Sequence, residues 1–196
     1  IQESEIRGQG SGMYVMGWDL YAGRNRIARR CGLDAAVRIG ADDERAAADA
    51  FTAGRGFDMA VMAFGGDGSD AMGKVKQVMK RSADGHQMGR VVLVGGLRTD
   101  CRWGAGMGNL DLLASARTGP GYHDEDWEHG RGSYPAAFVR WDTASNMALV
   151  LRLIAEGRLK VKPLTTQRFP LDRIDQAVDA HLNAPARTLG TVILMD

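Results

Sequence analysis

Asp19 is the residue whose type and position most directly suggest a binding site. It lies near the end of YVMGWDL (14–20), a short apolar run typical of a strand. A carboxylate at the carboxyl end of a parallel strand can accept hydrogen bonds from both ribose hydroxyls of an adenosine, and its charge repels a 2′-phosphate. We therefore predict that Asp19 favours NAD over NADP, and that Arg24, at the start of the next helix, covers the adenine face. The alternative is that Asp19 only caps a turn or a helix.

Three glycines near the start, Gly8, Gly10 and Gly12, are a candidate phosphate-binding turn. Their spacing is G-x-G-x-G rather than the G-x-G-x-x-G of dinucleotide-binding turns, so the signal is weak. Only Met13 separates them from the strand at Tyr14, whereas parallel strands need a crossover of roughly a dozen residues. The helix that would direct its N-terminus at a pyrophosphate is therefore missing. Either a stretch between Gly12 and Tyr14 has been lost, or the chain does not make this half of the site.

Two further strand ends carry residues that suit a bound dinucleotide. They close the apolar runs FDMAVMAF (57–64) and RVVLVGGL (90–97). Small residues at such ends let a ligand approach the backbone closely, although each end alone is more typical of an ordinary turn. Their order along the chain after Asp19 makes them candidate cofactor-binding positions. These candidates are Ala63, Phe64, Gly95 and Gly96.

The acidic segment YHDEDWEH (122–129) is rich in residue types that bind metals. Its two histidines, His123 and His129, are six positions apart and share no helix face, so we predict a solvated segment and no metal site. No Ser-His-Asp or Cys-His arrangement is visible from spacing, and no catalytic residue is assigned. Cys31 and Cys101 are too far apart for a zinc knuckle and indicate buried free thiols of a cytoplasmic protein.

The segments that would position these groups alternate between strand and helix patterns. The predicted strands are 14–20, 35–39, 57–64, 90–97 and 191–196. The predicted helices are 24–31, 41–54, 69–79, 145–157 and 171–182. Ser69 is expected to cap the third helix, 159–169 to be extended, and 110–116 to be the only regular stretch between 98 and 141. This alternation predicts βαβ units in a doubly wound, Rossmann-like parallel sheet of the α/β class.

The composition restricts the class of partner. The 196 residues carry 25 Lys and Arg against 24 Asp and Glu, so a net charge of +1 creates no field that favours nucleic acid or anionic lipid. No apolar run approaches the roughly 20 residues of a membrane span, and the start shows no secretory signal. We expect a cytoplasmic protein with a small-molecule ligand and with neither a nucleic-acid nor a membrane partner.

The order of these blocks resembles the zinc-type medium-chain dehydrogenase/reductase superfamily, which includes alcohol dehydrogenases. WDLYAGRNRIARRCGLDAAV is similar to its second strand and helix, where an acid, a basic residue and a Gly-x-Asp recur; the matching residues are Asp19, Arg24, Gly32 and Asp34. GRGFDMAVMAFGG and GRVVLVGG resemble its fourth and fifth strands. Residues 118–164 look most like the dehydrogenase-like half of bacterial two-domain oxidoreductases of this superfamily. The resemblance covers about residues 14–196.

The resemblance implies NAD(H) binding and reversible hydride transfer between nicotinamide and an alcohol or carbonyl substrate. Zinc would act there as a Lewis acid held mainly by an N-terminal catalytic domain that this chain does not contain. By the same resemblance, residues 1–157 form the dinucleotide-binding domain and residues 158–196 return to the absent domain. Alone, that last segment would leave apolar surface and strand edges exposed, which predicts a homo-oligomer.

Two other interpretations remain open. The chain can be a non-catalytic nucleotide-binding or scaffold protein that derives from such an enzyme and has lost its chemistry. A methyltransferase-like sheet that binds S-adenosylmethionine is a weaker interpretation, since an acid after the second strand serves that ribose too. The substrate does not follow from the sequence.

Overall fold

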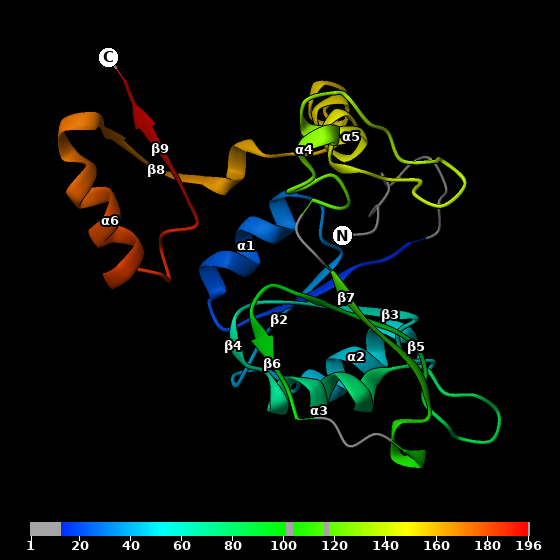
Figure 1. The fold of residues 1–196 in the computed structure, drawn as a ribbon. Coiled ribbons are helices and arrows are strands. Elements are labelled where there is room, and N and C mark those ends of the chain that lie inside the picture. The colour runs from blue at the N-terminus through cyan, green and yellow to red at the C-terminus, as the bar shows by residue number, and fades with distance from the viewer. Residues whose placement is uncertain (1–12, 101–103, 116–117, 196) are drawn as a thin grey trace. The chain divides into compact units, whose positions relative to one another are not determined.

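A computed structural model describes residues 13–100, 104–115 and 118–195 (Figure 1). The chain divides into two compact units. Unit 1 takes residues 1–47 and 154–196, and unit 2 takes residues 48–153. The predicted glycine turn at 8–12 lies outside the described residues.

Unit 1 begins with a parallel strand pair joined by a helix. Strand β1 (Met16–Asp19) leads into helix α1 (Ala22–Arg30), which leads into β2 (Ala35–Arg38). The two strands are in register, so that Asp19 lies opposite Arg38. Helix α1 ends near Gly32, as predicted, because this glycine takes a φ of 111°, a conformation that side chains with a Cβ rarely adopt.

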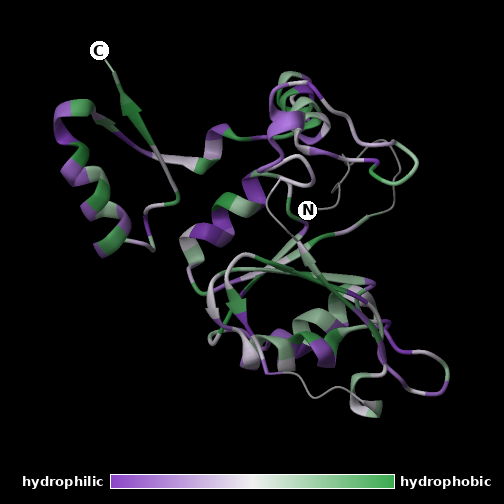
Figure 2. Ribbon diagram, viewed as in Figure 1, coloured by the Kyte–Doolittle hydropathy of each residue, from purple (hydrophilic) through white to green (hydrophobic). Residues whose placement is uncertain are grey.

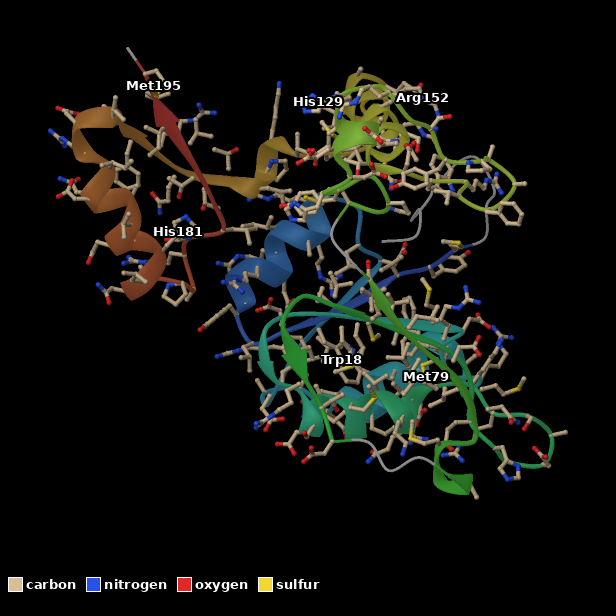
Figure 3. The ribbon with its side chains drawn as sticks, viewed as in Figure 1. Trp18, Met79, His129, Arg152, His181 and Met195 are labelled. Atoms are coloured by element: carbon tan, nitrogen blue, oxygen red, sulfur yellow. The ribbon has the colours of Figure 1, made fainter. Side chains whose placement is uncertain are left out.

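The C-terminal part of unit 1 repeats this arrangement. Strand β8 (Thr165–Pro170) pairs in parallel with β9 (Gly190–Leu194), and helix α6 (Ile174–Asn183) connects them. Single 3₁₀ turns at Lys162–Leu164 and Leu171–Arg173 flank β8, so only the second half of the expected extended segment is a strand. His181 Nε2 of α6 lies 2.9 Å from Thr191 Oγ1 of β9 (Figure 3), which links the helix to its strand.

Unit 2 contains a three-stranded parallel sheet with the order β3-β5-β7. Its strands are β3 (Met59–Ala63), β5 (Met88–Val94) and β7 (Asn109–Ser115). Helix α3 (Ser69–Val78) joins β3 to β5, and α2 (Glu44–Thr52) precedes β3. Figure 1 shows α2 and α3 on the same side of this sheet. Two-residue strands β4 (Gly66–Asp67) and β6 (Leu97–Arg98) pair in parallel just past β3 and β5, and a 3₁₀ turn (Ala105–Met107) precedes β7.

Among the described residues of unit 2, the core lies on one face of this sheet. The core consists of buried side chains from β3, α3, β5 and the residue after α3, namely Met62, Met72, Met79 and Val91 (Met79 in Figure 3). Leu93, Leu110 and Leu112 pack against it from the strands. Because alternate residues of a strand point to opposite faces, Val61 and Leu113 point the other way, and they remain 42% and 44% exposed.

Residues 118–153 of unit 2 add no strand. Helix α4 is a single turn (Glu125–Glu128), and α5 (Thr143–Ala155) begins in unit 2 and ends in unit 1. The one-turn α4 was not predicted. It forms because the Asp124 side chain accepts a hydrogen bond from the Trp127 N–H and so caps it.

The structure also corrects the cap of α3. Ser69 is the first residue of the helix, and its side chain does not cap it. The Asp67 carboxylate accepts hydrogen bonds from the Ser69 N–H (2.9 Å) and hydroxyl (2.7 Å) instead, because a capping side chain must come from a residue ahead of the first turn and Ser69 already lies within it.

The predicted fold class is confirmed. All paired strands in the described ranges are parallel, and α1, α3 and α6 each connect two strands of a pair. The arrangement is α/β and Rossmann-like. Of the helices that the structure describes, none has the length and apolar character needed to cross a membrane.

Candidate functional site

Asp19 stands at the carboxyl end of β1, and its two carboxylate oxygens have different partners. Oδ1 accepts a hydrogen bond of 2.7 Å from the Tyr21 N–H. Oδ2 lies 3.9 Å from Arg24 Nη1, a distance that gives a weak ion pair. The side chain is 31% exposed. A carboxylate has about four acceptor positions, so Asp19 retains capacity for further donors such as a ribose diol.

Arg24 is held beside Asp19 by three contacts within unit 1. Its Nη1 faces Asp19, its Nη2 donates to the Pro185 carbonyl (2.9 Å), and its guanidinium carbon lies 4.9 Å from the centre of the Tyr21 ring. Its Nε is buried and has no acceptor among the described residues. A buried N–H without a partner is costly, so this atom marks a position where an acceptor oxygen would be favourable.

Two residues near Asp19 were missed by the sequence reasoning. Tyr21 supplies the N–H that orients the carboxylate and the ring under Arg24. Arg38 ends β2 at the same level as Asp19 and is itself held by hydrogen bonds with Leu20 and Asp42. The signal for Arg38 was present, because it closes the second strand as Asp19 closes the first.

In unit 2 the structure brings the other candidate residues together. Ala63 pairs with Val94 at the ends of β3 and β5, and the Gly66 N–H donates to the Gly96 carbonyl at 3.1 Å. Gly95 takes a φ of 91°, and a Cβ there would lie 3.6 Å from the carbonyl oxygen of Phe64. Phe64 is 41% exposed. The predicted neighbours Ala63, Phe64, Gly95 and Gly96 therefore share one edge of this sheet.

A polar cluster lies just past these two strand ends. Asp67 Oδ2 is 3.3 Å from Arg98 Nη2, and the Ser69 hydroxyl accepts a hydrogen bond from the Asp100 N–H (3.0 Å). Hydrogen bonds from Ser69, then the bond from Arg98, lower the pKa of Asp67 from its ordinary value of 3.8. Asp67 therefore stays ionised and stabilises the first turn of α3.

The candidate residues are thus divided between the units. Asp19 and Arg24 belong to unit 1, and the pairs at the ends of β3 and β5 belong to unit 2. Each group has the geometry given above within its own unit, and their joint use by one ligand stays a prediction.

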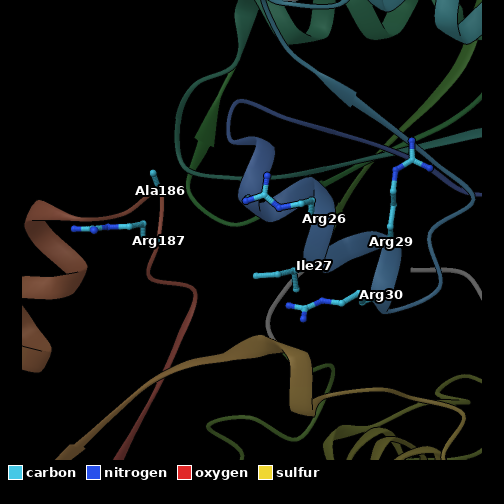
Figure 4. Close-up of a pocket in the computed structure, with 7 residues that line it drawn as sticks. Arg26, Ile27, Arg29, Arg30, Ala186 and Arg187 are labelled. Carbon is cyan, nitrogen blue, oxygen red and sulfur yellow. The ribbon is translucent and has the colours of Figure 1, made fainter.

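Unit 1 also has an open hollow of about 620 Å³ between α1 and the turn before β9. Arginines dominate its lining: Gly23, Arg26, Ile27, Arg29, Arg30, Ala186 and Arg187. Figure 4 shows the side chains of Arg29 and Arg187 pointing away from each other, and Arg29 donates to the Ala36 carbonyl (3.4 Å). These guanidinium groups give the hollow positive charge without converging on one ligand position.

Acidic side chains of the segment 122–129 accept hydrogen bonds from neighbouring residues of the same unit. Asp124 Oδ2 accepts from the Tyr134 hydroxyl (2.6 Å), Asp126 from Arg131 Nε (2.9 Å), and Glu128 from the His123 N–H (3.0 Å). In the part of the chain that the structure describes, no three His, Cys, Asp or Glu side chains gather as metal ligands. Cys31 is a half-buried free thiol that donates to the Lys160 carbonyl at 3.5 Å, and Cys101 lies outside the described residues.

Comparison with known proteins gives structural neighbours only. No known protein family and no curated protein matches the sequence. An oxidoreductase/dehydrogenase of unknown specificity involved in membrane biogenesis from Escherichia coli matches with a TM-score of 0.68 at 14% identity, over 93% of this chain and 44% of that one. A zinc-dependent alcohol dehydrogenase from Streptococcus pneumonia matches with a TM-score of 0.66 at 16% identity, over 93% and 45%.

A third neighbour was solved with NADH. This short chain alcohol dehydrogenase from Escherichia coli CFT073 has a TM-score of 0.64 at 14% identity, over 93% of this chain and 44% of its own. The chain therefore spans less than half the length of each of these structures. At such identities the similarity establishes the fold, which is that of part of alcohol dehydrogenase-like oxidoreductases.

Proposed function

We propose that this chain binds NAD(H) as the nucleotide-binding part of an oxidoreductase that transfers a hydride between nicotinamide and an alcohol or carbonyl substrate. In such a protein NAD supplies the site that accepts or releases the hydride. The chain's own residues bind and orient the cofactor. No described residue is assigned a catalytic role, and the small-molecule substrate, like zinc, would be held largely by residues outside this chain.

The observation that carries this proposal is the position, exposure and unused hydrogen-bonding capacity of the Asp19–Arg24 pair. Asp19 ends a parallel strand, keeps unused acceptor capacity and is partly exposed. Among the residues that the structure describes, Arg24 Nε beside it is a buried donor without an acceptor. Asp19 thus offers acceptors to a sugar diol, and the partly exposed Arg24 guanidinium beside it can donate to the sugar oxygens.

At the ends of β3 and β5, the backbone leaves room for a dinucleotide to approach. Gly96 has no heavy atom within 4 Å of the position a Cβ would take, and Gly95 requires a positive φ. A ligand can therefore approach this backbone closely. Phe64 presents a partly exposed ring at the same edge.

Replacing Asp19 by Asn tests the proposal. The amide keeps the size of the side chain but removes the charge, so we expect NADH to bind about ten- to a hundredfold more weakly, because charge-assisted hydrogen bonds to the ribose are lost. NADPH should lose less affinity, since the repulsion of its 2′-phosphate is also removed. Calorimetric titration of both nucleotides measures the ratio.

Asp58→Asn is the matched control. Asp58 precedes β3, at the opposite end of its strand, and pairs with Lys80 at 2.7 Å. This variant should leave NADH affinity unchanged. Equal affinity of the Asp19→Asn variant and the wild-type chain for NADH would show that the carboxylate only stabilises its turn. Binding of S-adenosylmethionine in place of NADH would assign the sheet to a methyltransferase-like ligand instead.

A further inference from the structure

The arginine-lined hollow of unit 1 has two walls that are fixed to each other. Helix α1 forms one wall, and the turn before β9 forms the other. Arg24 Nη2 donates to the Pro185 carbonyl of that turn at 2.9 Å. A Cβ at Gly23 would lie 3.5 Å from the Ala186 carbonyl oxygen, so the helix also approaches the turn closely. Both walls belong to unit 1, and the hollow is therefore a feature of that unit by itself.

The arginines of this hollow have no carboxylate partners among the described residues. Arg26, Arg30 and Arg187 are exposed, and none of them forms an ion pair with a residue that the structure describes. Helix α1 is largely hydrophilic (Figure 2) but contains no acid, and its Arg26 and Arg30 are one turn apart, where like charges repel. The helix dipole favours cations in the last turn, which accounts for Arg30 but not for Arg26 or Arg187. A negatively charged ligand would relieve this repulsion.

The shape of the hollow indicates a ligand whose charges are spread along its length. The hollow is open and has a volume of about 620 Å³. Its guanidinium groups do not converge on one position (Figure 4), so a single phosphate cannot contact them together. Ile27 is half-buried and lies beside Arg26 and Arg30 on α1, so it offers an apolar contact next to the charges.

We propose that this hollow binds an acidic polypeptide segment of a partner protein, in which carboxylates are interrupted by apolar side chains. Arginine pairs with a carboxylate through two parallel hydrogen bonds. The carboxylates of successive residues in such a segment reach guanidinium groups that point in different directions, and an apolar side chain between them contacts Ile27. The inference does not depend on the proposed function, because Arg26, Arg30 and Arg187 are not assigned to the cofactor.

A nucleic acid fits the same surface less well. Its backbone is long and uniformly charged, and its binding requires many basic contacts. The turn beside the hollow follows directly on α6, which carries the exposed acids Asp175 and Asp179. These carboxylates would repel a polyanion that extends past the hollow, whereas a short acidic segment ends within it.

The experiment uses the full chain and a labelled synthetic peptide of glutamates interrupted by leucines, with fluorescence anisotropy as the readout. The hollow variant combines Arg26→Gln, Arg30→Gln and Arg187→Gln. It should bind the peptide at least about tenfold more weakly than the wild-type chain, because three charge pairs are lost. Lysine at the same three positions keeps the charge and should hold the affinity within about threefold of wild type. Raising the salt from about 0.02 M to about 0.2 M should weaken binding to the wild-type chain at least about threefold.

The matched control variant removes the same charge from exposed arginines outside the hollow. It combines Arg55→Gln, Arg168→Gln and Arg173→Gln. Its affinity for the peptide should stay within about twofold of wild type. Exposed substitutions of this kind usually leave stability nearly unchanged, and thermal unfolding of both variants checks that they are folded.

Four results would overturn the inference. The first is an equal affinity of the hollow and control variants for the peptide. The second is equal binding of a peptide that carries glutamine in place of each glutamate. The third is tighter binding of an oligothymidylate of the same charge, which would assign the hollow to nucleic acid. The fourth is displacement of the peptide by NADH, which would assign these arginines to the cofactor. A wild-type chain that binds the peptide but not NADH refutes the proposed function only.

Discussion

Aspartate side chains in the two units differ in how many hydrogen bonds they already accept, as a comparison of Asp19 in unit 1 with Asp124 and Asp142 in unit 2 shows. In unit 1, Asp19 accepts one short hydrogen bond through Oδ1, makes a weak ion pair with Arg24 through Oδ2 and remains 31% exposed. In unit 2, Asp124 and Asp142 each bind donors through both oxygens, and they connect α4 to the start of α5. The acidic segment 122–129 has more of the residue types expected at a binding site, yet both oxygens of its Asp124 already accept hydrogen bonds within unit 2. The bonds that a carboxylate already makes decide whether it is available to a ligand.

The largest expected effect is that of a substitution at Gly121, which should destabilise residues 118–146 of unit 2 and leave the surroundings of Asp19 in unit 1 unchanged. Gly121 has a φ of 101°, and a Cβ there would lie 2.7 Å from the Trp127 ring. Gly121→Val should cost about 3 kcal/mol through backbone strain and steric overlap. Hydrogen exchange should accelerate across 118–146, while that of α1 stays unchanged. Normal exchange in 118–146 would mean that the ring moves aside at little cost.

The second prediction separates stability from binding. Asp142 accepts from the Ser145 N–H (2.8 Å) and hydroxyl (2.6 Å) and from Trp127 Nε1 (3.3 Å), so it caps α5. Asp142→Ala should lower Tm by about 3 °C because these donors lose their acceptor. It should leave NADH affinity unchanged, the reverse of Asp19→Asn. Thermal unfolding and NADH titration on the same samples check both parts, and a joint loss of stability and affinity would contradict the comparison.

The third prediction concerns pH. The hydrogen bond from Tyr134, then that from the Trp127 N–H, lowers the pKa of Asp124 below 3.8, and the same bond raises the pKa of Tyr134 above 10.0. The Asp124 contribution is therefore complete above about pH 4 and is lost as the pH falls through the lowered pKa. The Tyr134 contribution is complete below pH 10 and is lost as the pH rises through the raised pKa.

Tyr134→Phe checks this pH dependence. It removes the hydroxyl, so the difference in stability between wild type and variant should be constant from about pH 4 to 10 and shrink outside that range. Urea unfolding across the range measures it. A difference that does not change at either extreme would show that the bond contributes nothing in solution.

The smallest expected effect is that of a substitution at Arg24, beside Asp19 in unit 1. Lysine in place of Arg24 cannot contact Asp19, the Pro185 carbonyl and the Tyr21 ring together, because only guanidinium is planar with several fixed donors. We expect Arg24→Lys to weaken NADH binding about two- to fivefold, as is typical of exposed ion pairs. Arg26→Lys on the same helix is the control and should have no effect. Equal affinities for both variants would remove Arg24 from the site.

Most of the fold was predictable because it depends on local patterns. Apolar runs identified β1, β2, β3, β5 and β9, and glycine marked the end of α1 at Gly32. Helix α4 and the role of Asp67 at α3 were missed, since each depends on a side chain reaching a particular N–H. Asp19 and Arg24 are neighbours, and Ala63, Phe64, Gly95 and Gly96 share an edge, but their role in binding a cofactor stays a prediction, and Tyr21 and Arg38 were not identified.

The sequence by itself determined the fold class, because hydrophobic periodicity and the alternation of strands with helices depend only on neighbouring residues. It also determined that an acid ends the first strand. Only the tertiary structure decided which carboxylates already accept hydrogen bonds and that Arg24 Nε is buried without an acceptor among the described residues. These properties depend on hydrogen bonds and burial between residues far apart in the chain, which no local pattern encodes.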